Sequence, residues 1–526
     1  MIIGIDTGGT NVDAVILDDR GVHGKAKVPN ERTQDSIEAV LKRLGIDRGG
    51  VNVDRVVVAT TLVVNAAVQN RLPACTNVIV PGPGLAPDRA FSGDENQVSG
   101  GTVDHRGRVT EHVDYDDRPE HDVVAITAKF SPRNPTLERR LHEDLAEQSN
   151  TVALGNESGA GFSFPERAAT TVANAKAKPI FATYERAVEQ ALASVGIDAP
   201  IYFLKGDGAM LDDAAMLSTP AHTVKGGSAA SALGLVALTG IRDCIAVDVG
   251  GTTTDLTRVR DGFPDTERNV GVGNLETAYP GVAASSLAVG GDTKISVHDE
   301  GYGLAEERVG NAVAFGGSAP TLTDALHVLD IFTDGDIDAA YGAIADLGSE
   351  EPEAIATEVL EAFTSSVASG IDEMSKPETQ TIVVGGVLAR ALAPRLVDST
   401  NTVSAYAVPR DADVSGAVGC GVARVSVDTA VHIDTERGVK TVTSVGPESV
   451  ESIETGTRYS DERAREIVED AAKRAAASAG GDESDPVEIL AYDRFNVVDR
   501  TRVVGQIINA RARVEPAIER VYAGGD

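Results

Sequence analysis

The sequence is poor in cysteine and has no long hydrophobic run, and both shortages exclude classes of protein. The 526 residues include three cysteines, which lie far apart at Cys75, Cys244 and Cys420. This spacing argues against a disulfide framework and against a cysteine-rich zinc or iron–sulfur site. No apolar run approaches the roughly 18 residues of a membrane-spanning helix. Because the first residues, MIIGIDTGGT, also lack the basic segment of a signal peptide, we expect a cytoplasmic protein with no membrane partner.

Positive charge is also scarce. Aspartate and glutamate number 80 against 47 lysines and arginines, which gives a net charge of −33, and lysine accounts for only 12 of the 47. A surface this acidic repels nucleic-acid phosphates and anionic lipids, so we expect no nucleic-acid partner. The acidic residues are spread along the whole chain. This distribution favours a halophilic protein, adapted to molar intracellular salt, over a calcium-loading protein or a protein with an acidic tail.

The hydrophobic content, 42% of the residues, is sufficient for large cores, and the length exceeds what a single core usually supports. Short apolar runs alternate with amphipathic segments, which predicts an α/β protein. The expected strands are Ile2–Ile5, Val12–Leu17, Val56–Ala59, Val123–Ile126, Ile201–Leu204, Ile245–Val249 and Thr381–Val384. The expected helices are Ser36–Leu44, Leu137–Gln148, Glu185–Val195, Ala229–Leu238 and Ile355–Met374. The small, polar segment Ser478–Pro486 is the best candidate for a linker.

One motif occurs twice, at residues 2–17 and 245–259. Each copy has an apolar strand ending in aspartate, one further residue, Gly-Gly-Thr, two residues, a second aspartate and another apolar run. The alternation of apolar residues on both sides of the glycines predicts a hairpin in each copy. Two such hairpins at domain-scale separation predict a duplicated fold with two equivalent halves.

The motif has the composition of a phosphate-binding turn. Paired glycines can adopt a positive φ and carry no side chain, so consecutive N–H groups can point at phosphate oxygens, and threonine hydroxyls add donors. These expected nucleotide-binding residues are Gly8, Gly9, Thr10, Gly250, Gly251, Thr252 and Thr253. Asp6 and Asp248, at the strand ends, are placed to bind Mg²⁺ through water. The motif has no P-loop lysine, and it does not open a helix as a dinucleotide-binding turn does.

Two further elements complete the expected site. Gly385 and Gly386 interrupt a β-rich run before a helix, where bare backbone would accommodate adenine and ribose. Asp13 and Asp255, the second aspartates of the motif, are candidates for orienting or deprotonating the attacking group, although either could only brace its hairpin. The chain contains neither H-E-x-x-H nor G-x-S-x-G, which argues against a zinc hydrolase and a serine hydrolase.

These elements, in this order, resemble the superfamily of sugar kinases, Hsp70 and actin. More specifically, the chain is similar to the hydantoinase A/5-oxoprolinase family over about residues 1–425. The residues that carry the resemblance are GIDTGGTNVDAVIL (4–17), ATTLVVNA (59–66), VALGNES (152–158), ERAATTVANA (166–175), YERAVEQAL (184–192), IYFLKGDGAML (201–211), LTGIRDCIAVDVGGTTTDL (238–256), APTLTDALHVL (319–329) and TIVVGGVLAR (381–390). The chain has Lys225-Gly226-Gly227-Ser228 where the family often has a Ser-Gly-Pro-Ala-like turn.

The resemblance implies a fold, a cofactor and an activity. The implied fold has duplicated actin-like (ribonuclease H-like) ATPase halves with insertions and a small C-terminal α+β segment, divided at residues 1–180, 181–428 and 429–526. The implied cofactors are ATP and Mg²⁺. The implied activity is that of an ATP-dependent hydrolase subunit, which phosphorylates a cyclic amide carbonyl before ring opening and acts with a hydantoinase B-like partner in an oligomer.

The sequence leaves other functions open. A small-molecule or sugar kinase of the same superfamily would share the hairpins, and an ATP-dependent ketone carboxylase subunit belongs to the same family. A third alternative is a nucleotide-gated activator, although such proteins often carry a cysteine-ligated cluster. Glu157, Arg167 and Asn174, in the middle segment of the resemblance, are candidates for substrate-side or domain-interface residues.

Overall fold

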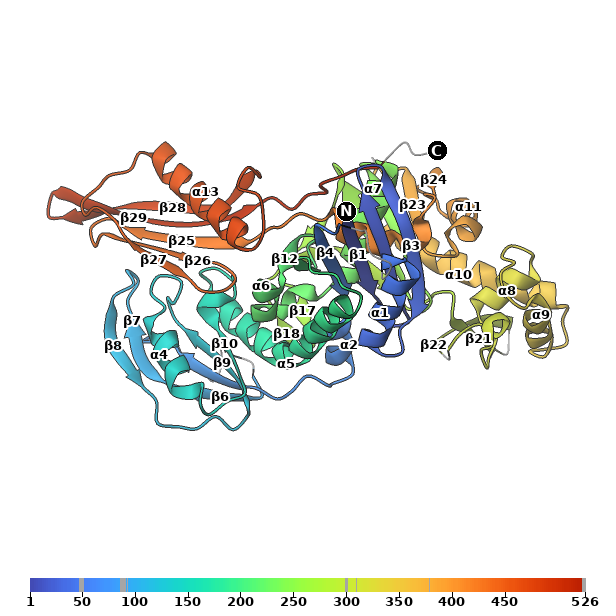
Figure 1. The fold of residues 1–526 in the computed structure, drawn as a ribbon, viewed down its shortest axis with the longest axis horizontal. Coiled ribbons are helices and arrows are strands. Elements are labelled where there is room, and N and C mark those ends of the chain that lie inside the picture. The colour runs from blue at the N-terminus through green and yellow to red at the C-terminus, as the bar shows by residue number, and fades with distance from the viewer. Residues whose placement is uncertain are drawn as a thin grey trace.

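Two central sheets with the same local topology organise the chain (Figure 1). The structure is a computed structural model. It describes residues 1–46, 52–85, 91, 93–298, 301–308, 310–377 and 379–522.

The first sheet has six strands in the order β12-β11-β4-β1-β2-β3. β1 pairs antiparallel with β2, from Ile2 opposite Leu17 to Thr7 opposite Val12, and parallel with β4. Valine and isoleucine dominate the central strands because helices cover both faces and bury their side chains. The strands are β1 (Ile2–Thr7), β2 (Asn11–Asp18), β3 (Gly21–Pro29), β4 (Arg55–Thr60), β11 (Ile201–Leu204) and β12 (Met210–Asp212).

The second sheet repeats this arrangement in the order β15-β14-β13-β23-β24, with β20 also paired to β14. Here β13 pairs antiparallel with β14 and parallel with β23, as β1 does with β2 and β4. The strands are β13 (Cys244–Val249), β14 (Thr254–Arg260), β15 (Phe263–Pro264), β20 (Ala284–Leu287), β23 (Thr381–Gly385) and β24 (Ala405–Ala407). The expected duplication of an α/β half is therefore confirmed.

Two helices, α7 (Gly226–Thr239) and α12 (Ser415–Val422), pack where the halves meet. α7 contributes to the core of the first sheet on one side and to that of the second on the other. The helices approach so closely that a Cβ on Gly234 would lie 1.8 Å from the carbonyl oxygen of Ser415. Glycine is required here by space, and the close contact fixes the halves relative to each other.

Longer helices cover the outer faces. α1 (Thr33–Arg43) and α5 (Phe164–Ser194) pack on the first sheet, while α10 (Pro352–Met374) and α11 (Ala389–Ser399) pack on the second. α5 continues through Pro179 and past the division expected at residue 180. The strands that follow it, β11 and β12, belong to the first sheet. The proposed divisions after residues 180 and 428 stay predictions.

Insertions extend both halves (Figure 1). The first carries a parallel sheet in the order β10-β9-β5-β6, with a helix and a hairpin: β5 (Thr76–Val80), β6 (Glu95–Val98), β7 (Gly100–Val103), β8 (Val109–Asp114), β9 (Val123–Ala128), α4 (Thr136–Leu145) and β10 (Thr151–Leu154). The second carries β21 (Thr293–His298), β22 (Gly301–Arg308), α8 (Leu322–Val328) and α9 (Ile337–Ala345). Shorter elements are α2 (Leu62–Val68), α6 (Asp213–Ser218), β16 (Thr266–Glu267), β17 (Gly271–Val272), β18 (Leu275–Glu276) and β19 (Gly281–Val282).

The C-terminal segment forms an α+β unit, as expected. Its antiparallel sheet has the order β27-β26-β25-β29-β28 and packs against α13. The elements are β25 (Asp428–Asp434), β26 (Val439–Thr443), β27 (Ser449–Ser452), α13 (Asp461–Ser478), β28 (Val487–Asp499) and β29 (Arg502–Val514). The expected linker, Ser478–Pro486, is wrong as an interdomain connection. It is a loop joining α13 to β28 inside this unit, because the apolar face of α13 packs on the sheet that β28 completes.

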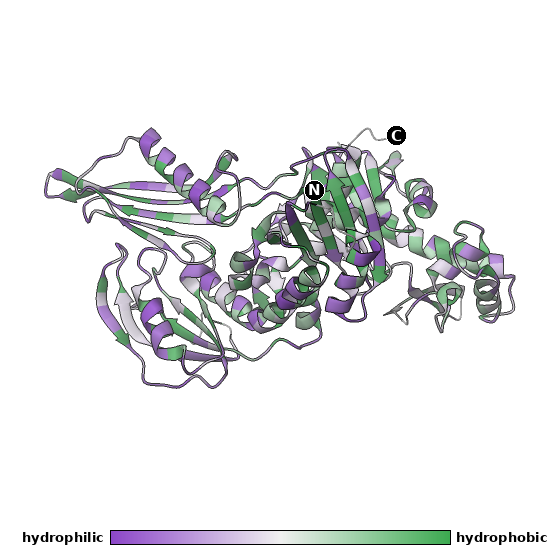
Figure 2. Ribbon diagram, in the orientation of Figure 1, coloured by the Kyte–Doolittle hydropathy of each residue, from purple (hydrophilic) through white to green (hydrophobic). Residues whose placement is uncertain are grey.

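Hydrophobic residues are concentrated in the strands of the two central sheets, and the outer faces of helices such as α13 are hydrophilic (Figure 2). Within the described ranges, none of the helices combines the length and apolar character needed to cross a bilayer. Every strand and helix expected from apolar periodicity is found, with ends shifted by a few residues except in α5, which begins 21 residues earlier at Phe164.

Candidate functional site

The two Gly-Gly-Thr motifs form hairpins with the same hydrogen bonds. In the first turn the N–H of Gly8 donates to the carbonyl of Asn11 at 3.0 Å, and in the second the N–H of Gly250 donates to that of Thr253 at 2.9 Å. The aspartates also occupy equivalent positions. Asp6 lies opposite Asp13 across the first hairpin, and in the second Asp248 lies opposite Asp255. The sequence repeat is therefore a structural repeat.

The paired glycines do not use the positive φ that glycine allows. None of Gly8, Gly9, Gly250 and Gly251 has its φ in the left-handed region. At Gly251 the reason for glycine is space, because a Cβ would lie 2.4 Å from Oδ2 of Asp292. The tight reversal is made by hydrogen bonds within each turn, so left-handed residues are not needed.

The third glycine pair lies beside the second hairpin. Gly385 is the register partner of Asp248 in the parallel ladder between β23 and β13. Gly386 has φ +94°, and a Cβ there would lie 2.1 Å from the carbonyl oxygen of Val249. Both the conformation and the close approach require glycine. The structure thus brings Gly385 and Gly386 to the second hairpin, while their contact with adenine and ribose stays a prediction.

The aspartates of the two hairpins lie close enough to interact electrostatically. Burial, with smaller contributions from the charges of Asp13 and Asp248, raises the pKa of Asp6 to about 8. Burial also raises the pKa of Asp13 to about 6, against the opposing effect of the Lys27 ammonium, and it raises the pKa of Asp248. Aspartates of the two halves therefore influence each other's protonation, and burial favours their neutral forms.

Three polar neighbours of these aspartates were not identified from the sequence. Nζ of Lys27, on β3, lies 3.1 Å from Oδ2 of Asp13. From α7, the Ser228 hydroxyl donates to Asp255 and the Ser231 hydroxyl donates to Asp248, each at 2.5 Å. Ser228 lies in the turn where the chain departs from the family pattern, which was the one available signal.

The arrangement fits a hydrated divalent cation and a polyphosphate. Oδ1 of Asp13 and Oδ1 of Asp255 are buried and have no hydrogen-bond partner in the described part of the chain. Carboxylate oxygens are the donors that Mg²⁺ prefers, and the expected metal residues, Asp6 and Asp248, lie opposite these two aspartates across the hairpins. Within the same ranges, the N–H groups of Gly9, Thr10, Gly251 and Thr252 donate to no protein acceptor, so they are available to phosphate oxygens.

Of the three candidates in the middle segment of the family resemblance, Glu157 and Asn174 contact other units of the protein. Arg167 is buried and donates to the carbonyls of Gly161 and Ala128. The Asn174 side chain donates to the Tyr279 hydroxyl at 2.8 Å, which ties α5 to the second half. For Glu157, the backbone carbonyl accepts from Gly446 of the C-terminal unit. The three cysteines are buried and unpaired, as expected of core residues.

Two equivalent α/β halves, each with an acidic Gly-Gly-Thr hairpin, define a duplicated α/β fold. The family models give the particular family. Residues 2–93 match the hydantoinase/oxoprolinase N-terminal region, and residues 167–429 match hydantoinase/oxoprolinase. The chain therefore belongs to the hydantoinase/oxoprolinase family.

Curated relatives are distant. Caprolactamase subunit alpha of Pseudomonas jessenii is 25% identical over 287 residues, which are 50% of this chain and 41% of that protein. An uncharacterized protein of Methanocaldococcus jannaschii is 24% identical over 379 residues, which are 64% of this chain and 54% of that protein. The chain thus spans about half the length of the curated relatives it matches.

Solved structures share the fold over nearly the whole chain. A nucleotide-free structure of acetone carboxylase has a TM-score of 0.70 at 16% identity and covers 100% of this chain and 88% of that chain. The ATP-dependent caprolactamase of Pseudomonas jessenii has a TM-score of 0.68 at 17% identity, covering 99% and 88% respectively. The insertions and the C-terminal unit are thus part of the shared fold.

Proposed function

We propose that the protein is the ATP-dependent subunit of a hydrolase that opens cyclic amides. The observation that carries this proposal is the convergence of four aspartates from two equivalent Gly-Gly-Thr hairpins in a member of the hydantoinase/oxoprolinase family. A relative named caprolactamase subunit alpha supports the class of substrate, because a caprolactam is a cyclic amide.

The two hairpins would hold the triphosphate of ATP from opposite sides. The free N–H groups of Gly9, Thr10, Gly251 and Thr252 would donate to phosphate oxygens, and the threonine hydroxyls would add donors. Asp6 and Asp248 would hold Mg²⁺, which supplies neutralisation of the phosphate charge when it is bound. Placing donors and acids in fixed positions lowers the barrier, because little reorganisation is left for the reaction itself.

The chemistry that such a site serves is activation of an unreactive carbonyl. The γ-phosphoryl group passes from ATP to the carbonyl oxygen of the cyclic amide, and ADP is released. Water then adds to the activated carbon, the ring C–N bond breaks, and hydrolysis releases phosphate. Overall, ATP, two water molecules and the cyclic amide are converted to ADP, phosphate and the ring-opened acid. Asp13 or Asp255 would accept the proton of the attacking group.

A partner subunit is part of this proposal. The relative's name denotes one subunit of an enzyme, and phosphorylation without a second site would leave the activated intermediate exposed to water. We propose a hydantoinase B-like partner that completes the ring opening. The chain alone would then bind ATP but form little ring-opened product.

The test is an assay of the purified chain, with and without such a partner, in Mg-ATP and 5-oxoproline, hydantoin or caprolactam. ADP and ring-opened product are both measured, and Asp248→Asn serves as the inactive control. Equal amounts of ADP and product, dependent on Asp248, would support the proposal. A phosphorylated sugar would establish the kinase alternative, and a carboxylated ketone formed in the presence of bicarbonate would establish the carboxylase alternative. Efficient ring opening by the lone chain would refute only the partner requirement.

A further inference from the structure

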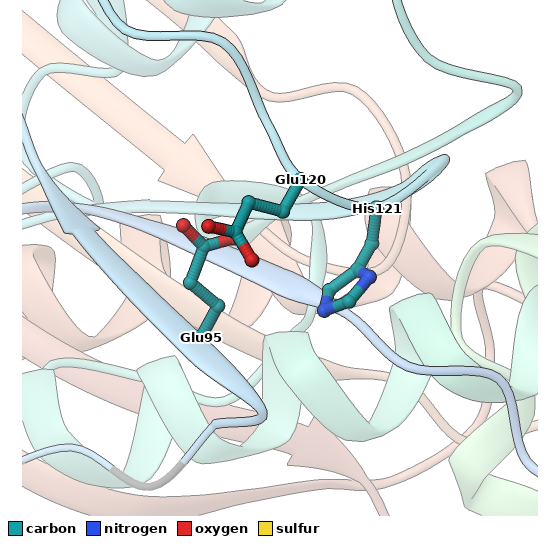
Figure 3. A group of neighbouring side chains, drawn as sticks. All are labelled: Glu95, Glu120 and His121. Carbon is teal, nitrogen blue, oxygen red and sulfur yellow. The ribbon is translucent and has the colours of Figure 1, made fainter.

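Three metal-ligating side chains gather on the first insertion, apart from the aspartates of the hairpins. Glu95 begins β6, while Glu120 and His121 lie just before β9. One carboxylate oxygen from each glutamate and one imidazole nitrogen lie within 4.8 Å of one another. Figure 3 shows the two carboxylate groups side by side, with the His121 ring next to them. We refer to these three residues as the insertion cluster.

Glu95, in the insertion cluster, is held in place by its neighbours. The Thr76 hydroxyl donates to Oε2 of Glu95 at 2.9 Å, and the Gln97 amide donates to Oε1 at 2.7 Å. The same Thr76 hydroxyl accepts from the backbone N–H of His121 at 3.1 Å. One residue of β5 therefore positions both segments of the cluster. Each carboxylate oxygen retains a lone pair, so these hydrogen bonds leave Glu95 able to bind a cation.

The negative charge of the cluster is not neutralised by a lysine or an arginine in the described part of the chain. The nearby Lys176 is paired with Asp94 at 2.8 Å instead. Two adjacent carboxylates without a counter-charge repel each other, and a bound cation would relieve that repulsion.

We propose that the insertion cluster binds a divalent transition-metal ion, with Zn²⁺ as the best match. An imidazole nitrogen suits zinc, whereas magnesium and manganese prefer oxygen ligands. Three protein ligands would leave the fourth position of a tetrahedral zinc ion to water. The ion would join β6 to the segment before β9, so its effect would fall on the stability of the insertion. This inference does not depend on the proposed activity.

The test is titration of the metal-stripped protein with ZnCl₂, MnCl₂ and MgCl₂ by calorimetry. We expect one equivalent of Zn²⁺ to bind, with affinity decreasing from Zn²⁺ to Mn²⁺ to Mg²⁺. Because changes in the residues around metal ligands cost about 10- to 100-fold in affinity, loss of a ligand in His121→Asn or Glu95→Gln should weaken Zn²⁺ binding by about 100-fold or more. Saturating Zn²⁺ should also raise the melting temperature of the wild type and not that of His121→Asn.

Two further variants keep the result interpretable. Glu120→Gln changes an exposed side chain, so it tests the cluster without threatening the fold. Glu189→Gln is the matched control, because Glu189 belongs to an acidic group with Glu185 and Asp213 that has no histidine. Zn²⁺ binding that is lost in the insertion variants and kept in Glu189→Gln would support the site. Absence of binding by the wild type, or unchanged affinity in Glu120→Gln and His121→Asn, would overturn it.

Discussion

The two hairpins share a backbone but have different neighbours. In the first half the second aspartate, Asp13, faces the ammonium of Lys27 at 3.1 Å. In the second half its equivalent, Asp255, faces the hydroxyl of Ser228 at 2.5 Å. Asp248 also receives a hydroxyl, from Ser231. One half therefore supplies a balancing charge, and the other supplies neutral hydrogen bonds.

The turns differ in the same way. In the first turn, the carbonyls of Gly8 and Thr10 accept from the side chain and the backbone N–H of Asn30 at 2.7 and 2.8 Å. In the second turn, the carbonyls of Gly250 and Gly251 accept from the N–H groups of Gly291 and Asp292 at 2.9 and 2.7 Å. Duplication thus preserved the acids and the turn, whereas the supporting residues diverged, and equivalent aspartates need not have equivalent roles.

The largest effect should come from the proposed metal aspartates, where the halves are expected to behave alike. Asp248→Asn and Asp6→Asn should each lower Mg-ATP-dependent turnover by on the order of 10³-fold or more, because each variant would lose a group that we propose holds Mg²⁺ on the phosphates. The measurement is ADP release at saturating ATP, with circular dichroism as the control for folding. Near-normal turnover in either variant would remove that aspartate from the metal site.

Substitution of the second aspartate of the motif should lower turnover more in the second half than in the first. We expect Asp255→Asn to lower turnover by about 10³-fold and Asp13→Asn by only about tenfold. Each aspartate keeps one unpartnered oxygen, but the ammonium of Lys27 already engages Asp13, whereas a neutral hydroxyl engages Asp255. The measurement is the steady-state rate of ADP release by each of the two variants. The reverse order would assign the proton acceptor to Asp13, whose pKa burial raises to about 6.

Acid should destabilise the C-terminal unit more than the two α/β halves. Burial lowers the pKa of His432, on β25, to about 4, so the fold favours the neutral imidazole. The contribution of the neutral His432 imidazole to the free energy of unfolding is complete above the ordinary pKa of 6.5. This contribution, about 3 kcal/mol, is lost as the pH falls from 6.5 towards 4. Acid has the opposite effect at Asp6 and Asp13. Because the fold raises their pKa values, it favours their protonated forms, and protonation does not destabilise the hairpins.

The measurement is amide hydrogen exchange in β25 and β1 at pH 7 and pH 4. Exchange in β25 should accelerate at pH 4 in the wild type and much less in His432→Gln. His142→Gln, which changes an exposed histidine of α4, serves as the matched control. Equal acid sensitivity of the wild type and His432→Gln would contradict the assignment.

The sequence predicted the hairpins because their signal is local. Alternating apolar residues, paired glycines and flanking aspartates all lie within about 16 residues of chain in each copy. Lys27, Ser228 and Ser231 could not be found in that way. They reach the aspartates from β3 and α7, and only tertiary packing brings those elements to the hairpins. A departure from the family pattern at Ser228 was visible, but it did not indicate a partner.

Other errors have equally specific causes. Composition allowed the paired glycines either a positive φ or a close approach, and it does not distinguish a need for φ from a need for space. α5 was expected to begin near Glu185, but it extends from Phe164 through Pro179 because tertiary packing outweighs the cost of proline inside a helix. The loop at residues 479–486 has the composition of a linker and lies within one unit.

Glycine substitutions should show which turn is closely packed. Gly251→Ala would bring a Cβ to 2.4 Å from Oδ2 of Asp292, whereas Gly9→Ala would place one 3.9 Å from Nδ2 of Asn65. Overpacking of this kind costs about 1–3 kcal/mol, so Gly251→Ala should be less stable by about 2 kcal/mol and Gly9→Ala nearly unchanged. Urea unfolding measures both variants. Equal stability would show that Asp292 moves aside without cost.

The smallest effect expected is a difference in salt dependence between the two supporting residues. Lys27 acts through its charge, in a partly buried ion pair with Asp13. Loss of this charge should lower the free energy of unfolding by about 1 kcal/mol at 0.1 M KCl and by much less at 2 M. The difference arises because the screening length falls from about 10 Å at 0.1 M to about 3 Å at 1 M. Ser228 acts through a hydrogen bond at 2.5 Å, so the cost of Ser228→Ala should not change with salt. Melting curves of the wild type, Lys27→Met and Ser228→Ala at both salt concentrations measure this. The wild-type curves also test the expected halophilic character, since a net charge of −33 should make the protein melt at a higher temperature in 2 M KCl. If the cost of Lys27→Met is the same at both concentrations, the lysine acts by packing, and the electrostatic contrast between the hairpins is wrong.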